Sequence, residues 1–323
     1  MNRSEIRPDG SDRVFSRTTY NGRPTVAILP APGKDGLMEA ESFYLIGSHL
    51  KARSVPVPEI YRYDNISGQL LVEDLGDTKF QYVATSLMDQ GHFSRLFLEY
   101  EKVLDVLVHM QVAGAEGFDP EWCWQEPYYD SNLAFDKEAL YFMNAFIKDF
   151  MRLSCNQEAL IQELKRLTGL VDEWCHIVFF LHRDFQSRNL MVATGAIRVI
   201  DFQAGRLGPW GYDLSSILHD PYVNIPWTMR LELYEYYLSR MTDMNEDFKR
   251  DEGLLREFFL LSMMRLLQAL GAYGFLSKRK KRPFFKAFIP RALFSLDKVL
   301  ESWHETDCVH LRSCVHRAIA EIS

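Results

Sequence analysis

Apolar and polar positions in the first 77 residues follow the pattern of a small sheet with one helix. Two stretches rich in strand-forming residues, Arg13–Tyr20 and Thr25–Leu29, flank an Asn-Gly pair at 21–22, which is typical of a two-residue hairpin turn. Apolar residues then recur at helical spacing over Leu37–Ala52, with acidic side chains near the start of that segment. Two further strands are predicted, at 59–64 and 69–73.

The rest of the chain is mainly helical by the same criterion. Helical spacing covers most of the chain after residue 229, with proline breaks near 283 and 290, and three earlier segments at 93–112, 137–153 and 157–175. The change of character after residue 77 predicts two lobes: a sheet-rich, nucleotide-binding lobe over 1–77, and a larger, mostly helical lobe over 78–323 that carries the catalytic loop, the metal site and the acceptor pocket. Ligands commonly bind in the cleft of such an arrangement.

Composition narrows the class of protein without deciding its function. The chain has 323 residues, a net charge of −7 and 47% hydrophobic residues, which is ordinary for a globular protein and excludes disordered and collagen-like classes. The acidic balance argues against broad nucleic-acid binding, so no nucleic-acid partner is expected. A basic run at 278–282 is interpreted as a solvated loop, with an anionic lipid or nucleic-acid site as the alternative.

Cysteines and apolar runs predict a cytoplasmic protein without membrane insertion. The five cysteines are scattered and form no CxxC pair, as expected for reduced thiols. The polar start MNRSEIRPDGS lacks a secretory apolar region, and the apolar runs at 177–181 and 258–264 are shorter than the roughly 18 residues that a membrane span needs. Two CxH pairs, at 308–310 and 314–316, suggest either a zinc site or a terminal packing helix, and we favour the helix.

The block LHRDFQSRNLMVATGAIRVIDFQ at 181–203 carries the candidate chemistry. An apolar strand leads into a loop with Asp184, and Asn189 follows five residues later. A tight hairpin over 190–200 then ends at Asp201, which places Asp201 beside Asn189. Two carboxylates and an amide oxygen are the hard ligands that Mg²⁺ prefers, and a carboxylate without metal can deprotonate a hydroxyl group. The block therefore predicts a phosphoryl-transfer site.

The same block resembles the catalytic and metal loops of the protein-kinase-like superfamily, within it the aminoglycoside phosphotransferase and choline kinase family, and there the bacterial N-acetylmuramate/N-acetylglucosamine anomeric kinases. Matching segments span most of the chain and include GSDRVFSR (10–17), LLVEDLGD (70–77), LHRDFQSRNLMV (181–192) and VIDFQAGRLGPWGYDLSSILHDPYV (199–223). The resemblance implies a two-lobed α+β fold with a small sheet-rich lobe and a larger helical one. It also implies ATP- and Mg²⁺-dependent transfer to a small-molecule hydroxyl group, with the anomeric hydroxyl of an N-acetylated amino sugar as the favoured acceptor.

The resemblance also implies roles for individual residues. Asp184 matches the catalytic base, and Asn189 and Asp201 match the Mg²⁺ ligands. Further positions match a loop over the nucleotide phosphates (Gly10, Ser11, Asp12, Arg13), a hinge whose backbone bonds adenine (Glu73, Asp74, Leu75), and supports of the catalytic loop (His182, Arg183, Asp213). Asp220 and Arg188 are weaker candidates for contact with the substrate, and for Asp220 a helix end before Pro221 is an equally good interpretation.

The chain departs from the protein-kinase pattern at the phosphate-binding lysine. The strand at 25–29 contains no lysine, and Lys34, Arg13 or Arg17 are the candidates to supply the missing positive charge. This departure leaves a nucleotide-binding pseudokinase scaffold as one alternative, against which the intact Asp184 argues.

The acceptor side departs from the sugar kinases as well. Met264, Leu266 and Gln268 stand where those enzymes often have polar residues, so the substrate of this chain can differ from theirs. A kinase for choline, ethanolamine or an aminoglycoside is the alternative that keeps the same chemistry.

Overall fold

The computed structural model describes residues 5–6, 12–176 and 178–322, so Gly10 and Ser11 of the predicted phosphate loop lie outside the described residues. The chain forms two compact units. Unit 1 consists of Met1–Tyr128, Phe179–Leu207 and Ser239–Asn245, and unit 2 consists of Tyr129–Val178, Gly208–Leu238 and Glu246–Ser323. Unit 1 therefore combines the predicted sheet-rich lobe with the block that carries the candidate chemistry. The lobe boundary after residue 77 stays a prediction.

A five-stranded antiparallel sheet in the order β1-β2-β3-β5-β4 forms the base of unit 1. The predicted hairpin is confirmed, because Asn21 and Gly22 have φ values of 50° and 79°, as a turn with two left-handed residues requires. The strands are β1 (Glu5–Ile6), β2 (Val14–Tyr20), β3 (Arg23–Leu29), β4 (Ile60–Tyr63) and β5 (Leu70–Glu73).

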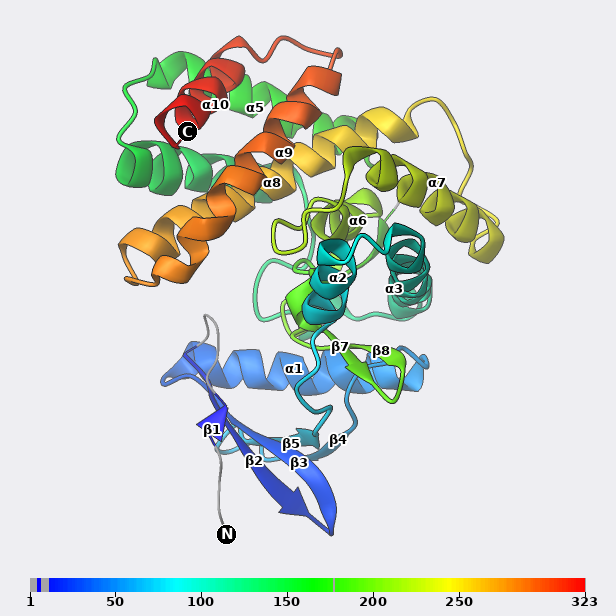
Figure 1. Cartoon of the computed structure of the whole chain (residues 1–323). Coiled ribbons are helices and arrows are strands. Elements are labelled where there is room, and N and C mark those ends of the chain that lie inside the picture. Colours follow the sequence, from blue (N-terminus) through cyan, green and yellow to red (C-terminus); the bar gives the residue numbers. More distant parts are fainter. Residues whose placement is uncertain (1–4, 7–11, 177, 323) are drawn as a thin grey trace. The chain divides into compact units, whose positions relative to one another are not determined.

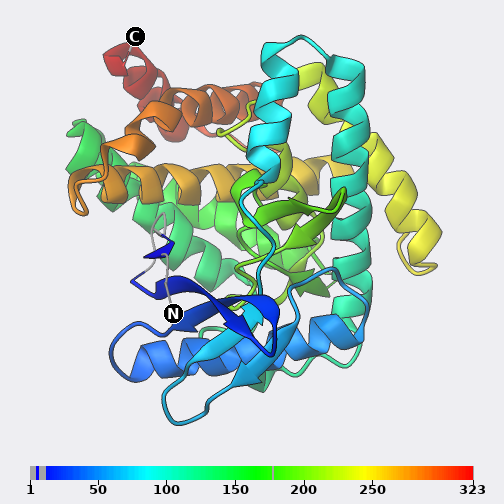
Figure 2. The ribbon, with the colours of Figure 1, turned by 60° about the horizontal axis from the view of Figure 1, so that its bottom comes forward.

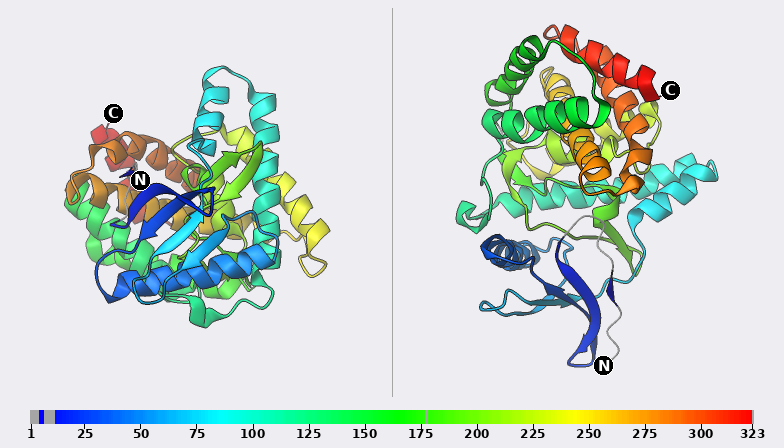
Figure 3. Two further views of the ribbon diagram at one scale, coloured as in Figure 1. Left: turned by 90° about the horizontal axis from the view of Figure 1, so that it is seen from below. Right: turned by 90° about the vertical axis from the view of Figure 1, so that its left-hand side faces the viewer.

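Helix α1 (Lys34–Ala52) lies along one face of this sheet (Figures 1 and 3). Its buried stripe includes Phe43 and Ile46, as the apolar spacing predicts. Gly47 allows a close approach, because a Cβ atom there would come within 2.8 Å of a ring carbon of Phe202. The helix thus packs directly on the residue that follows a predicted metal ligand.

The predicted hairpin in the chemistry block is present as β7 and β8, and its register pairs Leu190 with Val199. Two antiparallel helices, α2 and α3, pack against it in unit 1 (Figure 2). We did not predict α2. The bounds are α2 (Phe80–Asp89), α3 (Phe93–Ala115), β7 (Leu190–Ala193) and β8 (Ala196–Val199), while β6 (Val178–Leu181) pairs with β9 (Arg206–Pro209).

Unit 2 is helical and is built around α8. The elements that pack on α8 within this unit include η2, η3, α5, α6, η5 and α9. Helix α7 packs on it as well, because the ring of Tyr234 lies 4.9 Å from that of Phe258. The segment predicted as a helix over 137–153 is helical, but η2 and η3 are π-helices. The predicted breaks near Pro283 and Pro290 are confirmed as helix boundaries, because η5 begins at Pro283 and α9 begins at Ile289. Pro290 lies in the first turn of α9, where its missing N–H group costs no hydrogen bond. The bounds are α4 (Ser131–Leu133), η2 (Ala134–Ala139), η3 (Phe142–Met151), α5 (Gln157–Trp174), α6 (Gly211–Leu218), α7 (Trp227–Met244, which enters unit 1 at residue 239), α8 (Leu254–Lys278), η5 (Pro283–Phe288), α9 (Ile289–Ser302) and α10 (Val309–Ile322).

Helix α8 corrects one expectation about apolar stretches. By length and composition it could cross a membrane, with a mean hydropathy of 1.4 over an 18-residue window, whereas the apolar runs of the sequence seemed too short. Isolated polar residues such as Arg265 interrupt those runs without much effect on the average. Because 78% of the window is buried inside the protein, α8 is a core helix of unit 2.

The two CxH pairs do not gather into a metal site. Cys308 and Cys314 are buried, whereas His316 is exposed on α10 and lies 2.9 Å from Asp297. Within residues 5–6, 12–176 and 178–322, no group of three or more histidine, cysteine, aspartate or glutamate side chains is arranged to hold a metal ion. Helix α10 packs on α5 and α9, with Leu311 and Val315 fully buried, so the carboxy-terminal segment is a packing helix.

The contact between α8 and η3 depends on Gly274, and replacing it should destabilise the protein. A Cβ atom at Gly274 would come within 2.9 Å of the carbonyl oxygen of Ala145, and backbone cannot move aside as a side chain can. We expect Gly274→Ala to lower the free energy of unfolding by about 1–3 kcal/mol in urea titrations. The control is Gly169→Ala on α5, where a Cβ atom meets nothing within 4 Å and alanine should stabilise the helix by about 0.5–1 kcal/mol. Equal effects of the two changes would contradict the packing described here.

Candidate active site

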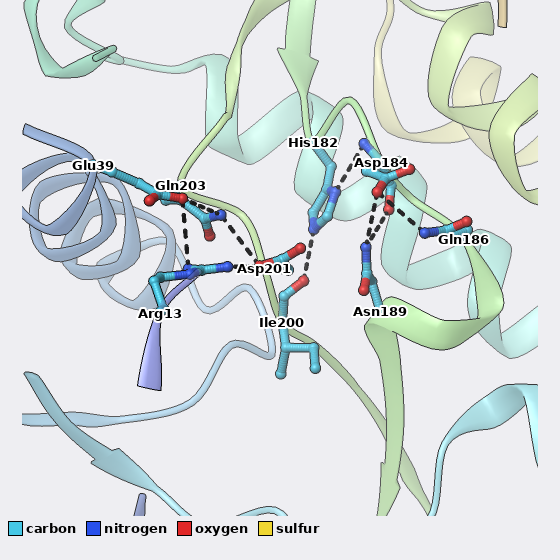
Figure 4. A network of polar contacts seen from close by, with 9 residues as sticks. All are labelled: Arg13, Glu39, His182, Asp184, Gln186, Asn189, Ile200, Asp201 and Gln203. Atoms are coloured by element: carbon cyan, nitrogen blue, oxygen red, sulfur yellow. Dashed lines mark hydrogen bonds and ion pairs between the residues drawn. The ribbon is translucent and has the colours of Figure 1, made fainter. Parts of the chain in front are cut away.

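The loop that follows β6 closes around Asp184 (Figure 4). Asn189 donates from Nδ2 to the backbone oxygen of Asp184 at 2.9 Å and to its Oδ2 at 3.4 Å. Gln186 donates from Nε2 to the same Oδ2 at 3.1 Å. The predicted base and one predicted metal ligand are thus brought together, and the donation from Nδ2 leaves Oδ1 of Asn189 as the atom that a cation can bind.

His182 fastens this loop to the end of the β8 hairpin. Its ring is buried, and Nε2 lies 2.9 Å from the backbone oxygen of Ile200. The backbone N–H group of Asp184 donates to Nδ1 at 3.3 Å. Because a carbonyl oxygen only accepts and an N–H group only donates, Nε2 of His182 donates to Ile200 and Nδ1 accepts from Asp184. These two bonds connect the loop at Asp184 to the end of β8, and the supporting role of His182 stays a prediction.

Asp201 follows Ile200 at the open end of the hairpin, the end at which Asn189 also lies. The backbone N–H group of Ile200 donates to the oxygen of Asn189 at 3.0 Å, so Asp201 lies one residue beyond the position opposite Asn189. Asp201 and Arg183 have φ values of 68° and 78°, a region that residues with a Cβ atom rarely adopt. Such strain persists where the surroundings fix the backbone, and it concentrates at functional sites.

The carboxylate of Asp201 is held by Arg13 and Gln203. Arg13 donates from Nη2 to Oδ1 at 2.6 Å, and Gln203 donates from Nε2 to the same oxygen at 3.2 Å. Burial alone would raise the pKa of Asp201, but the charge and hydrogen bond of Arg13, with the bond from Gln203, bring this pKa below its ordinary value. Asp201 is therefore ionised at neutral pH, and both bonds on Oδ1 leave Oδ2 available for a cation.

Glu39 on α1 completes this network, and it was not among the predicted site residues. Its Oε1 lies 3.8 Å from Nη1 of Arg13 and accepts from Nε2 of Gln203 at 3.2 Å. Ser42, one turn further along α1, donates to the backbone oxygen of Gln203 at 2.9 Å. One feature of the sequence could have indicated Glu39: it lies four residues before Phe43, on the face of α1 that is buried. A charged side chain on a buried face needs a partner of opposite charge or a hydrogen bond.

The residues present fit a magnesium–nucleotide complex. The side-chain atoms of Asn189 and Asp201 that can bind a cation are oxygens, because Nδ2 of Asn189 donates to Asp184. Asp201 is also ionised. Two protein ligands suffice when the other oxygens come from phosphates and water, which is how Mg²⁺ is usually held beside a nucleotide.

The side chains of the predicted hinge are engaged within unit 1. Glu73 accepts from Nη2 of Arg198 at 2.6 Å, and although burial would raise the pKa of Glu73, this bond lowers it below its ordinary value. Asp74 accepts from Nε of Arg17 at 2.9 Å. The backbone N–H groups of these two residues are also engaged, with the oxygens of Glu59 at 2.8 Å and of Pro24 at 3.4 Å. A backbone hydrogen bond from this segment, which includes Leu75, to adenine stays a prediction.

Two arginines close to Asp184 in sequence, Arg183 and Arg188, each donate to a glutamine of unit 1. Arg183 donates from Nη1 to Gln125 at 3.2 Å, and Arg188 donates from Nη1 to Gln81 at 3.2 Å. Arg188 is nearly buried, so its contact with a substrate stays a prediction. Asp12, the described neighbour of Arg13, is exposed.

Asp213 and Asp220 belong to unit 2, and their predicted roles stay predictions. Asp213 is fully buried within α6. Asp220 is buried just after that helix and accepts from the backbone N–H group of Tyr222 at 2.9 Å. Next to it, Nδ1 of the buried His219 accepts from Nη1 of Arg230 at 2.9 Å.

His219 should make the stability of the protein depend on pH. Burial, and then the charge of Arg230, hold the pKa of His219 well below its ordinary value. As the pH falls through about 6.5, His219 becomes protonated in the unfolded chain but stays neutral in the folded chain. The contribution of His219 to the free energy of unfolding is therefore complete above that pH and decreases as the pH falls. We expect His219→Gln to remove a slope of about 1.4 kcal/mol per pH unit below about pH 6 in urea unfolding. An unchanged slope would contradict the neutral, buried state of His219.

A family model described as "Phosphotransferase enzyme family" matches residues 3–247.

The chain belongs to the phosphotransferase enzyme family.

Two curated relatives of this phosphotransferase are named N-acetylmuramate/N-acetylglucosamine kinase. The one from Neisseria meningitidis is 27% identical over 309 residues, which cover 92% of this chain and 85% of the relative. The one from Pseudomonas aeruginosa is 25% identical over 293 residues, which cover 89% and 81%. The predicted phosphotransferase family is confirmed, and so is the prediction of an enzyme that acts on a small-molecule hydroxyl group. The chain is similar to the N-acetylmuramate/N-acetylglucosamine kinases over most of its length.

Solved structures confirm the fold class. The choline kinase LicA from Streptococcus pneumoniae matches with a TM-score of 0.62 at 10% identity, over 92% of this chain and 94% of that one. LicA has also been solved in complex with AMP. At this identity the likeness shows the two-lobed kinase-like α+β fold and nothing about the acceptor.

Proposed function

We propose that this phosphotransferase moves the γ-phosphoryl group of ATP to the anomeric hydroxyl group of an N-acetylated amino sugar. The observation that carries the reaction type is the joining of Asp184 and Asn189 by hydrogen bonds, with the ionised Asp201 at the end of the adjoining hairpin. The choice of acceptor is supported by the names of the curated relatives, which are similar to this chain over about nine-tenths of its length.

In this proposal, five residues of unit 1 have a task in the reaction. Oδ1 of Asn189 and Oδ2 of Asp201 would hold Mg²⁺, which when bound neutralises charge on the β- and γ-phosphates. Asp184 accepts the proton of the sugar hydroxyl as the sugar oxygen bonds to the γ-phosphorus and the bond from that phosphorus to the ADP oxygen breaks. Gln186 orients the Oδ2 atom of Asp184, and His182 holds its backbone.

The acceptor is a favourable one for a carboxylate base. An anomeric hydroxyl group is more acidic than an ordinary alcohol, so a carboxylate is a sufficient base to take its proton. Orientation of the hydroxyl group for in-line attack supplies much of the rate.

Release of ADP from Mg·ATP tests the proposal. N-acetylglucosamine and N-acetylmuramate are compared with their 1-O-methyl glycosides, in which the anomeric oxygen is blocked. Turnover of the free sugars without turnover of the glycosides is the expected result. Equal turnover of the free sugars and their glycosides would place the phosphoryl group on another hydroxyl group. No turnover of any of the four compounds would contradict the proposed acceptor.

Choline, ethanolamine and an aminoglycoside belong in the same assay. Turnover of one of these alone would replace the sugar with that acceptor and keep the phosphotransfer chemistry. Binding of ATP without turnover of any acceptor would favour a pseudokinase scaffold. A cytoplasmic location stays a prediction.

A further inference from the structure

Arg13 occupies an unusual place for a charged side chain. It lies just before β2, its side chain is 9% exposed, and its guanidinium carbon lies 5.4 Å from the ring centre of Phe15. It bonds to Oδ1 of Asp201 at 2.6 Å and lies 3.8 Å from Oε1 of Glu39. A single buried cation thus joins the start of the sheet, helix α1 and a predicted metal ligand (Figure 4).

We propose that Arg13, positioned by Glu39, is the phosphate-binding cation that replaces the missing strand lysine, and that its bond to Asp201 keeps metal out of the site until a polyphosphate arrives. The inference rests on the proposed function, because it assumes that Asp201 binds the metal of a metal–nucleotide complex.

Electrostatics gives the reason for this coupling. A divalent cation on Asp201 would lie next to the guanidinium group of Arg13, and two positive charges at that range repel. Phosphate oxygens bind a guanidinium group through paired charge-assisted hydrogen bonds. When the guanidinium group of Arg13 bonds to the phosphates instead of to Asp201, the carboxylate of Asp201 becomes available for the metal. Glu39 still holds Arg13, and Gln203 still holds Asp201. Metal and polyphosphate therefore favour each other's binding, and by the same factor.

The other cations considered for this task are placed less well. Arg17 is bonded to Asp74 at 2.9 Å and to Asp77 at 2.6 Å, beside the predicted hinge. Lys34 is exposed at the first residue of α1. Ile28 of β3 is apolar and lines the same small cavity as Arg13 and Glu39. The positive charge next to Glu39 is therefore supplied by Arg13, just before β2, and not by a residue of β3.

Two binding measurements on Arg13→Ala test the proposal, because their expected changes have opposite signs. Dissociation constants for ADP and for adenosine are measured by calorimetry with Mg²⁺ present, and binding of Mn²⁺ without nucleotide is measured by electron paramagnetic resonance. We expect ADP to bind about tenfold more weakly or worse, adenosine to change by less than about twofold, and Mn²⁺ alone to bind several-fold more tightly.

Arg23→Ala is the matched control. Arg23 lies 3.7 Å from Glu59, and its guanidinium carbon lies 5.6 Å from the ring centre of Tyr61, much as Arg13 lies near Glu39 and Phe15. It is exposed at the start of β3, so all three constants should match the unmodified protein. Should Arg13→Ala not fold, Arg13→Gln removes the charge and keeps hydrogen-bond donors, with the same expected signs.

Two results would overturn the inference while leaving the proposed function standing. One is an unchanged affinity of Arg13→Ala for ADP, and the other is weaker binding of both ADP and Mn²⁺, which a purely structural role would produce. If the unmodified protein binds no ADP and turns over no acceptor, the proposed function fails and the inference fails with it.

Discussion

Asp184→Asn is expected to lower kcat by about 10³-fold while the protein keeps its affinity for Mg·ADP. Asparagine has the shape of aspartate but cannot accept the proton of the sugar hydroxyl. The amide of Asn189 can still donate to the backbone oxygen of residue 184, so the loop is expected to keep its structure. Steady-state kinetics give kcat, and calorimetry gives the affinity for Mg·ADP.

The control for this change is Asp89→Asn, which alters an exposed carboxylate at the end of α2 in the same unit. Its kinetics should match those of the unmodified enzyme. Unchanged turnover in Asp184→Asn would show that another group accepts the proton. Loss of nucleotide binding together with turnover would instead make Asp184 a structural residue.

Asp201→Asn should lower kcat by about 10³-fold as well, but through the metal and not through the proton. The neutral amide loses the charge that attracts Mg²⁺, so the Mg²⁺ concentration needed for half-maximal activity should rise several-fold. It also loses the ion pair with Arg13, which is 2.6 Å long. Activity is measured over a range of Mg²⁺ concentrations at saturating ATP.

A second arginine–carboxylate pair serves as the control for Asp201→Asn. It shows whether loss of an ion pair alone, without loss of a metal ligand, changes the Mg²⁺ dependence. Glu116 also lies 2.6 Å from an arginine, Arg53, but both side chains are partly exposed and remote in sequence from the chemistry block. Glu116→Gln should leave the Mg²⁺ dependence unchanged. If Asp201→Asn leaves it unchanged too, Asp201 is not a metal ligand.

The parts of the site that the sequence could predict are those set by local geometry. Asp184 and Asn189 lie five residues apart in one loop, and the β7–β8 hairpin fixes where Asp201 returns. The turn residues and the alternation along the two strands determine the register of that hairpin. The residues just before and just after the hairpin are therefore expected to lie close together.

The network around Arg13 could not be predicted in the same way. Arg13 and Asp201 are 188 positions apart, and their contact depends on how α1 packs on the sheet and on Phe202. The sequence marked Arg13 only as one of three candidate cations. Glu39 looked like an ordinary acid in the first turns of a helix, because apolar spacing does not reveal which charged side chain a distant segment will meet.

The π-helices show a second limit of sequence patterns. The spacing over 137–153 indicated a helix, and η2 and η3 are helical, but their backbone bonds run from residue i to i+5. Gly274 on α8 fits closely against η3 at Ala145, a tertiary contact that apolar spacing within either segment does not show.

Correlated ³¹P–¹H nuclear magnetic resonance of the product formed from N-acetylglucosamine and Mg·ATP tests the central claim most directly. The account predicts a phosphate whose phosphorus couples to the anomeric proton of the sugar. Coupling to the protons on carbon 6, or to any other ring proton, would contradict an anomeric kinase.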